Sequence, residues 1–393
     1  MRTTLILLTL FCCSHLNAFS LPQIPIKSYD CDTCESLPHE TLQARWKINE
    51  NPLTGTKRNI HKSYSYTKQV TATQLQQGIS LAIHSPEAVI RIIPLEKNKS
   101  VPPLELKTSS GDFMSLKEAA SLYSQDEAID ESLKINSRQT MLQIKRELGK
   151  GPFIVKSKQA IPAGEAGKYL IDVFEKYSLL YLQIEPSSLQ YRYGDPFHAL
   201  ITLKDNVTTY PVEDINATLI GPDNQVIPLQ IKEVKRNQFQ ASGILSSEVN
   251  THGDNWYIAV DVSCEIEDNL PAYRSGRAAF SYSIPSASLV SIMKVSSKPL
   301  TLAATVNAAT ASRYALQSVL YRKNAQGKPI PVETTQIAQW LEPGMNRIKF
   351  SFDNSAHLAE DQLSVGYLHL TDYGQLKVVY QYDQPINLSQ LLD

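Results

Sequence analysis

The sequence has few cysteines, and it lacks the short motifs that identify the commonest hydrolases and nucleotide-binding proteins. Five cysteines occur in 393 residues, which is too few for a disulfide scaffold. HExxH, GxSxG and GxxxxGK[ST] do not occur, so the metalloprotease, α/β-hydrolase and P-loop arrangements that these motifs encode are excluded. We therefore expect a protein that is not an enzyme. A glycosidase remains open, since it needs only two carboxylates that no spacing reveals.

Long apolar runs and an excess of either charge are also missing. The chain has 38 basic and 39 acidic residues, so it offers no electrostatic footprint for nucleic acid or for an acidic membrane surface. No stretch approaches the roughly 20 apolar residues that a membrane-spanning helix needs. We expect no nucleic-acid partner and no membrane span, and the sequence leaves the oligomeric state open.

The first 18 residues have the pattern of a signal peptide. Arg2 supplies a positive start, residues 5–13 form a short apolar core, and Ala18 is a small residue suited to cleavage. A lipid anchor is disfavoured because the residue before Cys12 is a phenylalanine. We predict a signal peptide over 1–18 and a protein that is exported through the periplasm and secreted.

From residue 179 to the end, short stretches alternate apolar and polar residues. This period of two is typical of strands with one buried and one exposed face. The clearest stretches are FHALITLKD (197–205), WYIAVDVSCEI (256–266), FSYSI (280–284), RIKFSFD (347–353) and LKVVYQYD (376–383). The faces expected to be buried include Trp256, Ile258, Val260, Val262 and Cys264 in the second stretch, and Leu376, Val378, Tyr380 and Tyr382 in the last.

Turn sequences such as Gly194-Asp195-Pro196 separate these stretches, and no helical pattern lies between them. Short strands joined by regular turns predict antiparallel sandwiches rather than a parallel sheet. An immunoglobulin-like (Ig-like) sandwich takes about 100 residues, so we divide this half into sandwiches at 179–286 and 287–393. The predicted fold class is mainly β, with tandem Ig-like antiparallel β-sandwiches.

Residues 19–178 are predicted to form a β-rich N-terminal domain that carries a helical insertion at about 115–150. Ser115 and Glu118 match a capping box, which marks the start of a helix. A second helix, ending at Gly149, is predicted from apolar residues at helical spacing. These residues are Met141, Ile144 and Leu148.

The spacing of Cys31 and Cys34 fits a redox pair, half of a zinc site or a disulfide. A zinc site needs two more nitrogen or sulfur ligands, and the one other cysteine after the signal peptide is Cys264, on the apolar face of 256–266. In an oxidising compartment the disulfide is favoured, while metal binding and redox catalysis remain alternatives. We predict that Cys31 and Cys34 pair and that Cys264 is a buried thiol.

No catalytic residue and no cofactor are predicted, and calcium is the cation for which the turns offer ligands. Acidic residues of turns offer it oxygen ligands: Asp195, Asp214, Asp254 and residues 265–269. Asx turns explain the same residues without a metal. His198 and His369 lie in strand patterns, and we interpret both as structural.

Four segments carry a resemblance to known families: YRYGDPFHALITLKD (191–205), YPVEDINATLIGPDNQVIP (210–228), HGDNWYIAVDVS (252–263) and GRAAFSYSIPSASL (276–289). They resemble bacterial Ig-like domains. They are also similar to macroglobulin-type sandwiches, in which a Y-x-x-G-D/E turn opens the domain and a G-x-x-W strand lies near its end. The whole chain resembles a family of secreted gammaproteobacterial proteins that includes type II secretion substrates of Legionella-like bacteria. This resemblance implies tandem Ig-like domains and export, and it carries over no catalytic residue.

We therefore expect a secreted, non-enzymatic binding protein, associated with virulence, that presents Ig-like surfaces to a protein or glycan ligand. Rigid sandwiches suit such a role because they hold variable loops in place. The alternative is a periplasmic or cell-surface structural module that acts as an accessory, an inhibitor or an adhesin. An enzyme is the third reading.

Overall fold

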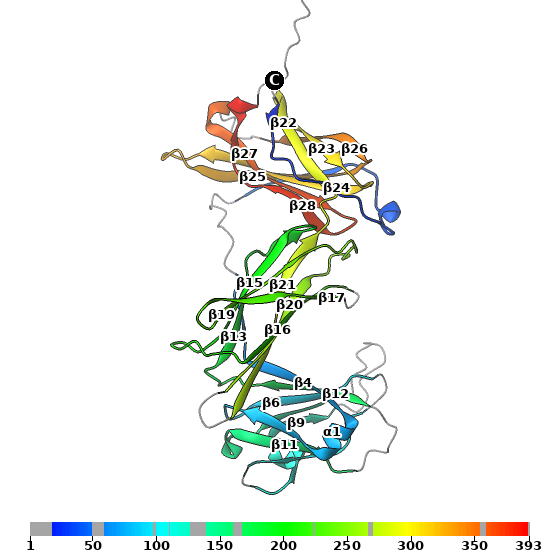
Figure 1. The fold of residues 1–393 in the computed structure, drawn as a ribbon. Coiled ribbons are helices and arrows are strands. Elements are labelled where there is room, and N and C mark those ends of the chain that lie inside the picture. The colour runs from blue at the N-terminus through cyan, green and yellow to red at the C-terminus, as the bar shows by residue number, and fades with distance from the viewer. Residues whose placement is uncertain are drawn as a thin grey trace, which may run out of the picture.

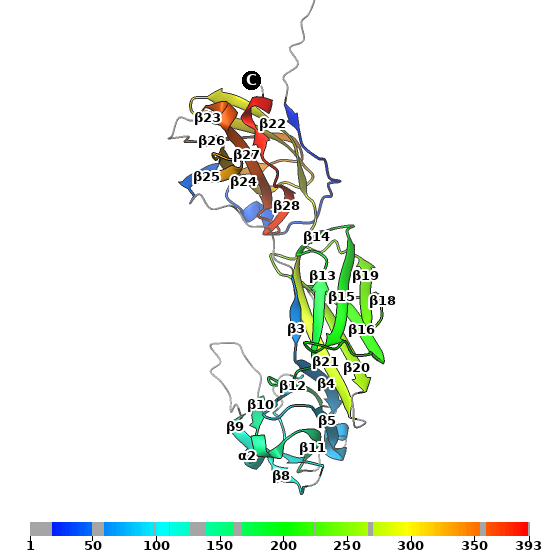
Figure 2. The same ribbon diagram turned by 90° about the vertical axis from the view of Figure 1, so that its left-hand side faces the viewer.

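The computed structural model describes residues 18–48, 59–96, 100–109, 111–125, 139–159, 167–222, 225–265, 270–353 and 359–391. The chain forms three β-rich domains that follow one another along the long axis of the molecule (Figures 1 and 2). Within these ranges, no helix is long and apolar enough to cross a membrane. The predicted signal peptide lies outside the described residues except for Ala18.

The N-terminal domain packs one antiparallel sheet, in the order β4–β12–β6–β10–β9, near a second, in the order β5–β11–β7–β8. Its core contains apolar side chains from both sheets and from two short helices, including Leu75 and Leu116. Its elements are β4 (Ser65–Thr71), α1 (Ala72–Gln77), β5 (Ile79–Ile83), β6 (Val89–Pro94), β7 (Leu104–Lys107), β8 (Met114–Ser115), α2 (Leu116–Ala119), β9 (Ala120–Gln125), β10 (Thr140–Ile144), the 3₁₀ helix η3 (Arg146–Leu148), β11 (Gly151–Ser157) and β12 (Lys168–Phe174).

The predicted helical insertion is largely wrong. The capping box is present, with Ser115 Oγ accepting from the Glu118 amide at 3.2 Å and Glu118 Oε2 from the Ser115 amide at 2.8 Å, but the helix is four residues long. The second predicted helix is instead the strand β10 followed by the short 3₁₀ helix η3, which ends before Gly149 as predicted. Leu142 and Ile144 also fit a period of two, and pairing with β6 and β9 buries both, whereas Met141 is 43% exposed.

The central domain is an antiparallel sandwich whose sheets have the orders β17–β16–β20–β21 and β18–β19–β15–β13–β3. The predicted inner face of residues 256–264 is confirmed, because every second residue from Trp256 to Cys264 is buried. The elements are β3 (His61–Ser63), β13 (Tyr181–Pro186), β14 (Gln190–Arg192), β15 (Pro196–Lys204), β16 (Asp214–Ile220), β17 (Val226–Pro228), β18 (Gln230–Lys235), β19 (Gln238–Ile244), β20 (Trp256–Glu265) and β21 (Pro271–Ser283).

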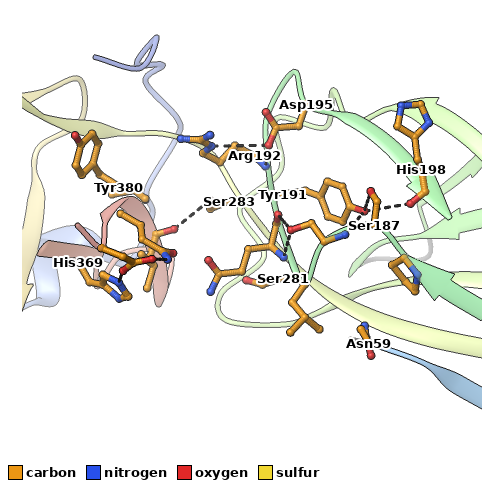
Figure 3. A pocket seen from close by; sticks show the side chains of 18 of the residues that line it. Asn59, Ser187, Tyr191, Arg192, Asp195, His198, Ser281, Ser283, His369 and Tyr380 are labelled. Carbon is orange, nitrogen blue, oxygen red and sulfur yellow. Dashed lines mark hydrogen bonds and ion pairs between the residues drawn. The ribbon is translucent and has the colours of Figure 1, made fainter. Parts of the chain in front are cut away.

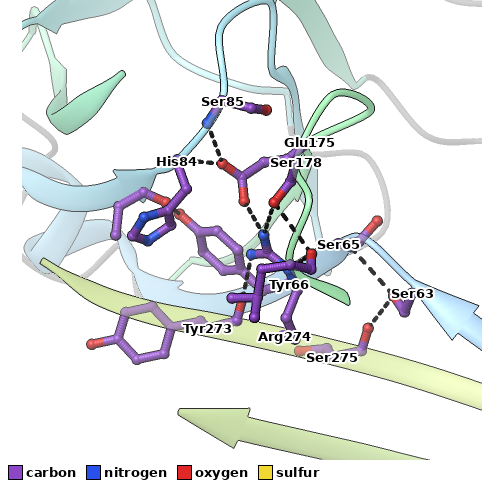
Figure 4. Close-up of polar contacts among 12 residues, drawn as sticks. Ser63, Ser65, Tyr66, His84, Ser85, Glu175, Ser178, Tyr273, Arg274 and Ser275 are labelled. Atoms are coloured by element: carbon purple, nitrogen blue, oxygen red, sulfur yellow. Dashed lines mark hydrogen bonds and ion pairs between the residues drawn. The ribbon is translucent and has the colours of Figure 1, made fainter. Parts of the chain in front are cut away.

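Strand β21 links the central domain to the N-terminal domain. It continues past the sandwich and pairs with β4 through Ser275 and Ser65, so that one sheet runs through both domains. Beside this crossing, Arg274 and Glu175 form an ion pair of 2.7 Å, and both side chains are fully buried (Figure 4). The two domains are therefore joined by a shared sheet and a buried charge pair.

The C-terminal domain is a sandwich with sheet orders β1–β22–β23–β26 and β2–β25–β24–β27–β28, and β29 pairs with β27. Most of the core comes from these sheets, including Phe350 and Phe352 of the predicted stretch 347–353. The elements are β1 (Phe19–Ser20), η1 (Cys34–Ser36), β2 (Leu42–Lys47), β22 (Ala287–Ser297), β23 (Leu300–Ala308), β24 (Ser312–Lys323), β25 (Pro329–Leu341), β26 (Gly344–Phe352), η6 (Glu360–Gln362), β27 (Leu363–Asp372), β28 (Lys377–Tyr382), β29 (Ile386–Asn387) and η7 (Leu388–Gln390).

The first described segment, residues 18–48, lies on this C-terminal domain, and we call it the N-terminal belt. Its strand β1 pairs with β22 and its strand β2 with β25. Figure 1 shows the blue belt around the yellow and red strands. We predicted that these residues belong to the N-terminal domain. The structure corrects this prediction, because the first strand of that domain is β4. Consecutive elements usually lie side by side. Here the belt pairs instead with strands about 270–295 positions away in the sequence.

The predicted alternation of residues 376–382 is wrong for Leu376 and Val378 and correct for Tyr380 and Tyr382, which lie in or against the core. Leu376 is 61% exposed, and the adjacent residues Val379 and Tyr380 are both in the core. The pairing of β27 with β28 shifts by one residue between Leu370 and Thr371, which marks a β-bulge. A bulge adds an unpaired residue and so changes the face on which the following side chains lie.

Candidate functional site

A groove of about 1640 Å³ lies between the central and the C-terminal sandwiches (Figure 3). One wall consists of β13, the turn 187–189, β14, and the outward faces of β15 and β19. The other wall consists of β27, β28 and the ends of β24 and β25. Ser281 and Ser283, near the end of β21, lie between the two walls. Ligand sites are concave, and domain interfaces are among the places where they occur preferentially.

The central wall is held by Tyr191, which the Y-x-x-G-D turn places in β14. Its hydroxyl lies 3.0 Å from Ser187 Oγ, accepts from the Ser188 amide at 3.0 Å, and donates to the His198 carbonyl at 3.3 Å. Its ring packs against Phe197 and Phe280 at 5.0 and 5.1 Å. The buried Tyr191 thus holds the turn 187–189 in place through its hydroxyl.

The same turn explains Asp195, one of the predicted calcium ligands. Asp195 Oδ2 accepts from the Arg192 amide at 2.7 Å and lies 3.8 Å from the Arg192 guanidinium. Gly194 between them has φ +85°, a backbone conformation that favours glycine. Asp195 therefore closes the turn that borders the groove by bonding back to the amide three residues before it.

The C-terminal wall carries an aromatic and acidic cluster. His369 Nε2 donates to Asp383 Oδ1 at 2.7 Å, and the His369 ring stacks on Tyr367 with 3.7 Å between ring centroids. Nearby, burial raises the pKa of Tyr321 to about 12, and the charge of Asp383 adds to the effect. Tyr321 is therefore a neutral phenol, able to donate a hydrogen bond, throughout the physiological pH range.

The angle between the two walls is fixed by hydrogen bonds that cross the domain boundary. Gln375 exchanges two of them with Ile284, accepting from its amide and donating to its carbonyl, each at 2.9 Å. Lys377 Nζ donates to the carbonyls of Gly253 and Asp254 at 2.9 and 2.8 Å. Burial lowers the pKa of Lys377. The Lys377 bonds tie β28 to the loop that precedes β20, and the Gln375 bonds tie the turn before β28 to the residue that follows β21.

The N-terminal belt adds contacts across the boundary between the central and C-terminal domains. Lys27 forms an ion pair of 3.0 Å with Glu248 and lies over the Tyr193 ring, both of the central domain. Tyr29 donates to Asp372 Oδ2 at 2.9 Å, inside the C-terminal domain. One segment therefore contacts both domains that form the groove.

Asp372 is a fully buried carboxylate with a complete set of donors. Its oxygens accept from Tyr29, Ser286, Ser312, Gln375 and the Gly374 amide at 2.6–3.0 Å. Burial and the Asp372 charge raise the pKa of Tyr29. A buried charge with this many hydrogen bonds is a structural anchor, because its desolvation is compensated by the donors.

The three cysteines of the described chain have structural roles. Cys31 and Cys34 form a disulfide in the belt. It lies against the Gly374 backbone, where an added Cβ would be 2.6 Å from Cys34 Sγ and 2.8 Å from Cys31 Sγ. Cys264 is a free, buried thiol in the central core, and burial raises its pKa to about 11.

The predicted calcium ligands do not come together. Asp195 lies at the groove, whereas Asp214 and Asp254 flank opposite ends of the central domain's β16–β20 pair. Residues 266–269 lie outside the described part of the chain. Among the residues that the structure describes, no group of three or more His, Cys, Asp or Glu side chains has the arrangement of a metal site.

The sequence did not identify the groove residues as functional. His198 and His369 were interpreted as structural, and the structure places one on each wall. Tyr367 was not singled out, although its backbone φ of +53° is unusual for a tyrosine. No local pattern could have found them, because the groove forms only when two domains meet.

Three family models match consecutive parts of the chain. They are the N-terminal, central and C-terminal domains of DUF4785, described as a domain of unknown function, over residues 33–175, 178–283 and 286–389. No curated protein matches. A crystal structure of a DUF4785 family protein from Legionella pneumophila is 48% identical, covering 94% of this chain and 99% of that one with a TM-score of 0.83.

Two other solved structures have low similarity. Trypsin-activated alpha-2-macroglobulin from Escherichia coli is 11% identical over 73% of this chain and 21% of that one, with a TM-score of 0.21. A tetra-tandem repeat of the extending region of a large adhesion protein is 9% identical over 90% of this chain and 83% of that one, again with a TM-score of 0.21. The three matched segments and the Legionella structure agree over nearly the whole length, and this chain belongs to the DUF4785 family.

Proposed function

We propose that this protein is an exported, non-enzymatic binding protein that holds its ligand in the groove between the central and C-terminal sandwiches. The observation that carries the proposal is the groove itself, whose two walls come from different domains and are tied together by Gln375, Lys377 and the N-terminal belt. A site that is already in its bound shape loses little conformational entropy when the ligand arrives.

The size of the groove favours a long ligand. Sites for drug-sized molecules have volumes of about 300–1,000 Å³, and this groove measures about 1640 Å³. It also runs from the turn 187–189 to the β27–β28 pair, on two different domains. A chain-like molecule that contacts both walls fits this shape better than a compact one.

Export is supported by the signal-peptide pattern of residues 1–18 and by the Cys31–Cys34 disulfide. Disulfides persist in oxidising compartments and are rare in the cytosol. The resemblance to type II secretion substrates supports release into the medium and an association with virulence. Fractionation of the producing cells tests this part: we expect the mature chain, cleaved after Ala18, in the culture medium. Retention in the periplasm would favour the alternative of an accessory module.

The binding site is tested by filling the groove. Gln240 lines it from β19 and is partly exposed, so Gln240→Trp should obstruct the ligand while changing the free energy of unfolding by less than about 0.5 kcal/mol. Gln69→Trp is the matched control, because Gln69 is an exposed strand residue of the N-terminal domain.

Both variants and the unmodified protein are screened on arrays of immobilised glycans and of tiled peptides. We expect at least one class of probe to bind the unmodified protein and Gln69→Trp equally, and to bind Gln240→Trp at least tenfold more weakly. Equal binding by all three proteins would place the site elsewhere. Turnover of any probe would show that the protein is an enzyme.

A further inference from the structure

We propose that the ligand of the groove is a neutral oligosaccharide that contacts the ring of Tyr367. This inference rests on the proposed function, since it names the ligand class for the same groove. It combines three observations: an unusual backbone at Tyr367, a fixed aromatic and polar array around it, and an opposite wall rich in amide side chains.

Tyr367 is placed by a bulge in β27. Gln317 pairs with His369 and Val319 with Gly366, so β27 has one residue more than β24 between these pairs. The extra residue leaves Tyr367 with φ +53°, which is uncommon for a bulky side chain. Ser318 Oγ donates to the Gly366 carbonyl at 3.2 Å, which gives this carbonyl a hydrogen-bond partner beside the bulge. Bulges and unfavourable backbone angles gather at functional sites because they re-aim a side chain.

The side chains around Tyr367 form a connected array. One face of its ring is covered by His369, while the ring remains partly exposed at the groove. His369 is held by Asp383, and Asp383 Oδ2 accepts from Gln381 Nε2 at 2.5 Å. A fixed tyrosine offers the apolar C–H face of a sugar ring a flat partner and a hydroxyl. The adjacent carboxylate and amide offer acceptors and donors to sugar hydroxyls.

The opposite wall is polar and lacks free positive charge. It presents amide side chains, which both donate and accept: Asn59, Gln190, Gln238 and Gln240. Arg192 is the one lysine or arginine among the described lining residues, and it already pairs with Asp195. Glu185, Asp195 and Asp383 leave the lining acidic. A phosphorylated, sulfated or otherwise anionic ligand is therefore disfavoured, and a neutral ligand rich in hydroxyls is favoured.

An extended peptide is the competing ligand. It would pair with β28, which ends its sheet in the part of the chain that the structure describes, and would need pockets for alternate side chains. The lining instead combines a presented ring with amides and hydroxyls, such as Ser187 and Ser281, along the far wall. We therefore argue for the saccharide and treat peptide binding as an outcome of the test.

The test is calorimetric titration of the mature protein with four neutral probes: cellohexaose, hexa-N-acetylchitohexaose, xylohexaose and mannohexaose. We expect at least one to bind, Tyr367→Ala to weaken that binding at least tenfold, and Tyr367→Phe to keep it within about threefold, because the ring is retained. Tyr177→Ala is the matched control, since Tyr177 is exposed and lies outside the groove. Gln381→Ala, at an exposed position, gives an independent variant if Tyr367→Ala does not fold.

The outcomes separate this inference from the proposed function. Binding of a hexaose that neither Tyr367→Ala nor Gln381→Ala weakens would overturn the saccharide site. Binding of peptides alone, blocked by Gln240→Trp, would overturn the saccharide and leave the groove as the binding site. Failure of every glycan and peptide to bind would overturn both proposals.

Discussion

Replacing Arg274 with methionine is expected to lower the free energy of unfolding by about 3–5 kcal/mol. Arg274 and Glu175 are both fully buried and lie 2.7 Å apart where β21 crosses into the N-terminal domain (Figure 4). Glu175 Oε1 also accepts from the amides of His84 and Ser85. Without the arginine, a carboxylate would remain buried with hydrogen bonds but no counter-charge, and that uncompensated charge is the source of the cost.

Arginine contributes packing as well as charge, and the control must account for both. Arg277→Met makes the same change at an exposed position of the same strand and should alter the free energy by less than about 0.5 kcal/mol. The double variant Glu175→Gln, Arg274→Met removes both charges and should be more stable than Arg274→Met alone. Urea unfolding in which Arg274→Met and Arg277→Met behave alike would show that the pair does not hold the two domains together.

Replacing Trp256 with alanine is expected to cost a similar amount, about 3–5 kcal/mol, as truncations of core aromatic residues do. Trp256 is fully buried and packs on Tyr282 with 5.4 Å between ring centroids. Gly221 lies so close that an added Cβ would be 2.5 Å from the indole ring. The backbone on that side already approaches as closely as it can, so a truncated side chain leaves a cavity.

Two further variants make this prediction specific. Tyr257→Ala removes an aromatic residue that is 39% exposed on the opposite face of the same strand, and should cost much less. Trp256→Phe should fall between them, since the indole Nε1 has no hydrogen-bond partner among the described residues and none is lost. Equal urea midpoints for Trp256→Ala and Tyr257→Ala would contradict the packing described here.

Where one face of a strand is buried and the other is exposed, the sequence alone predicts the fold well. Residues 256–264 and 348–352 alternate without interruption, and both stretches have the predicted register. The helix predicted from Met141, Ile144 and Leu148 is a strand over Thr140–Ile144, because both periods fit so short a stretch and only pairing with β6 and β9 decides between them. In residues 376–382 the prediction fails only at Leu376 and Val378, because a bulge at Val379 changes the period within the strand.

The belt and the groove depend on contacts that no local pattern encodes. Phe19 pairs with Ile292 and Leu42 with Ala338, and the short strands β1 and β2 give no sign of these distant partners. The Cys31–Cys34 pair could be predicted because its spacing is local, but its position against Gly374 could not. In the same way, His198 and His369 are separate strand residues until the two sandwiches meet.

The central claim is that the two walls form one preformed site, and the distance between them tests it most directly. Spin labels on Leu189→Cys and Pro329→Cys place one exposed probe on each wall. Native cysteines should not react, because Cys31 and Cys34 are paired and Cys264 is buried. Double electron–electron resonance on the labelled protein should give a single narrow distance distribution. A broad or two-peaked distribution would show that the domains move independently, and would contradict the account of a fixed groove.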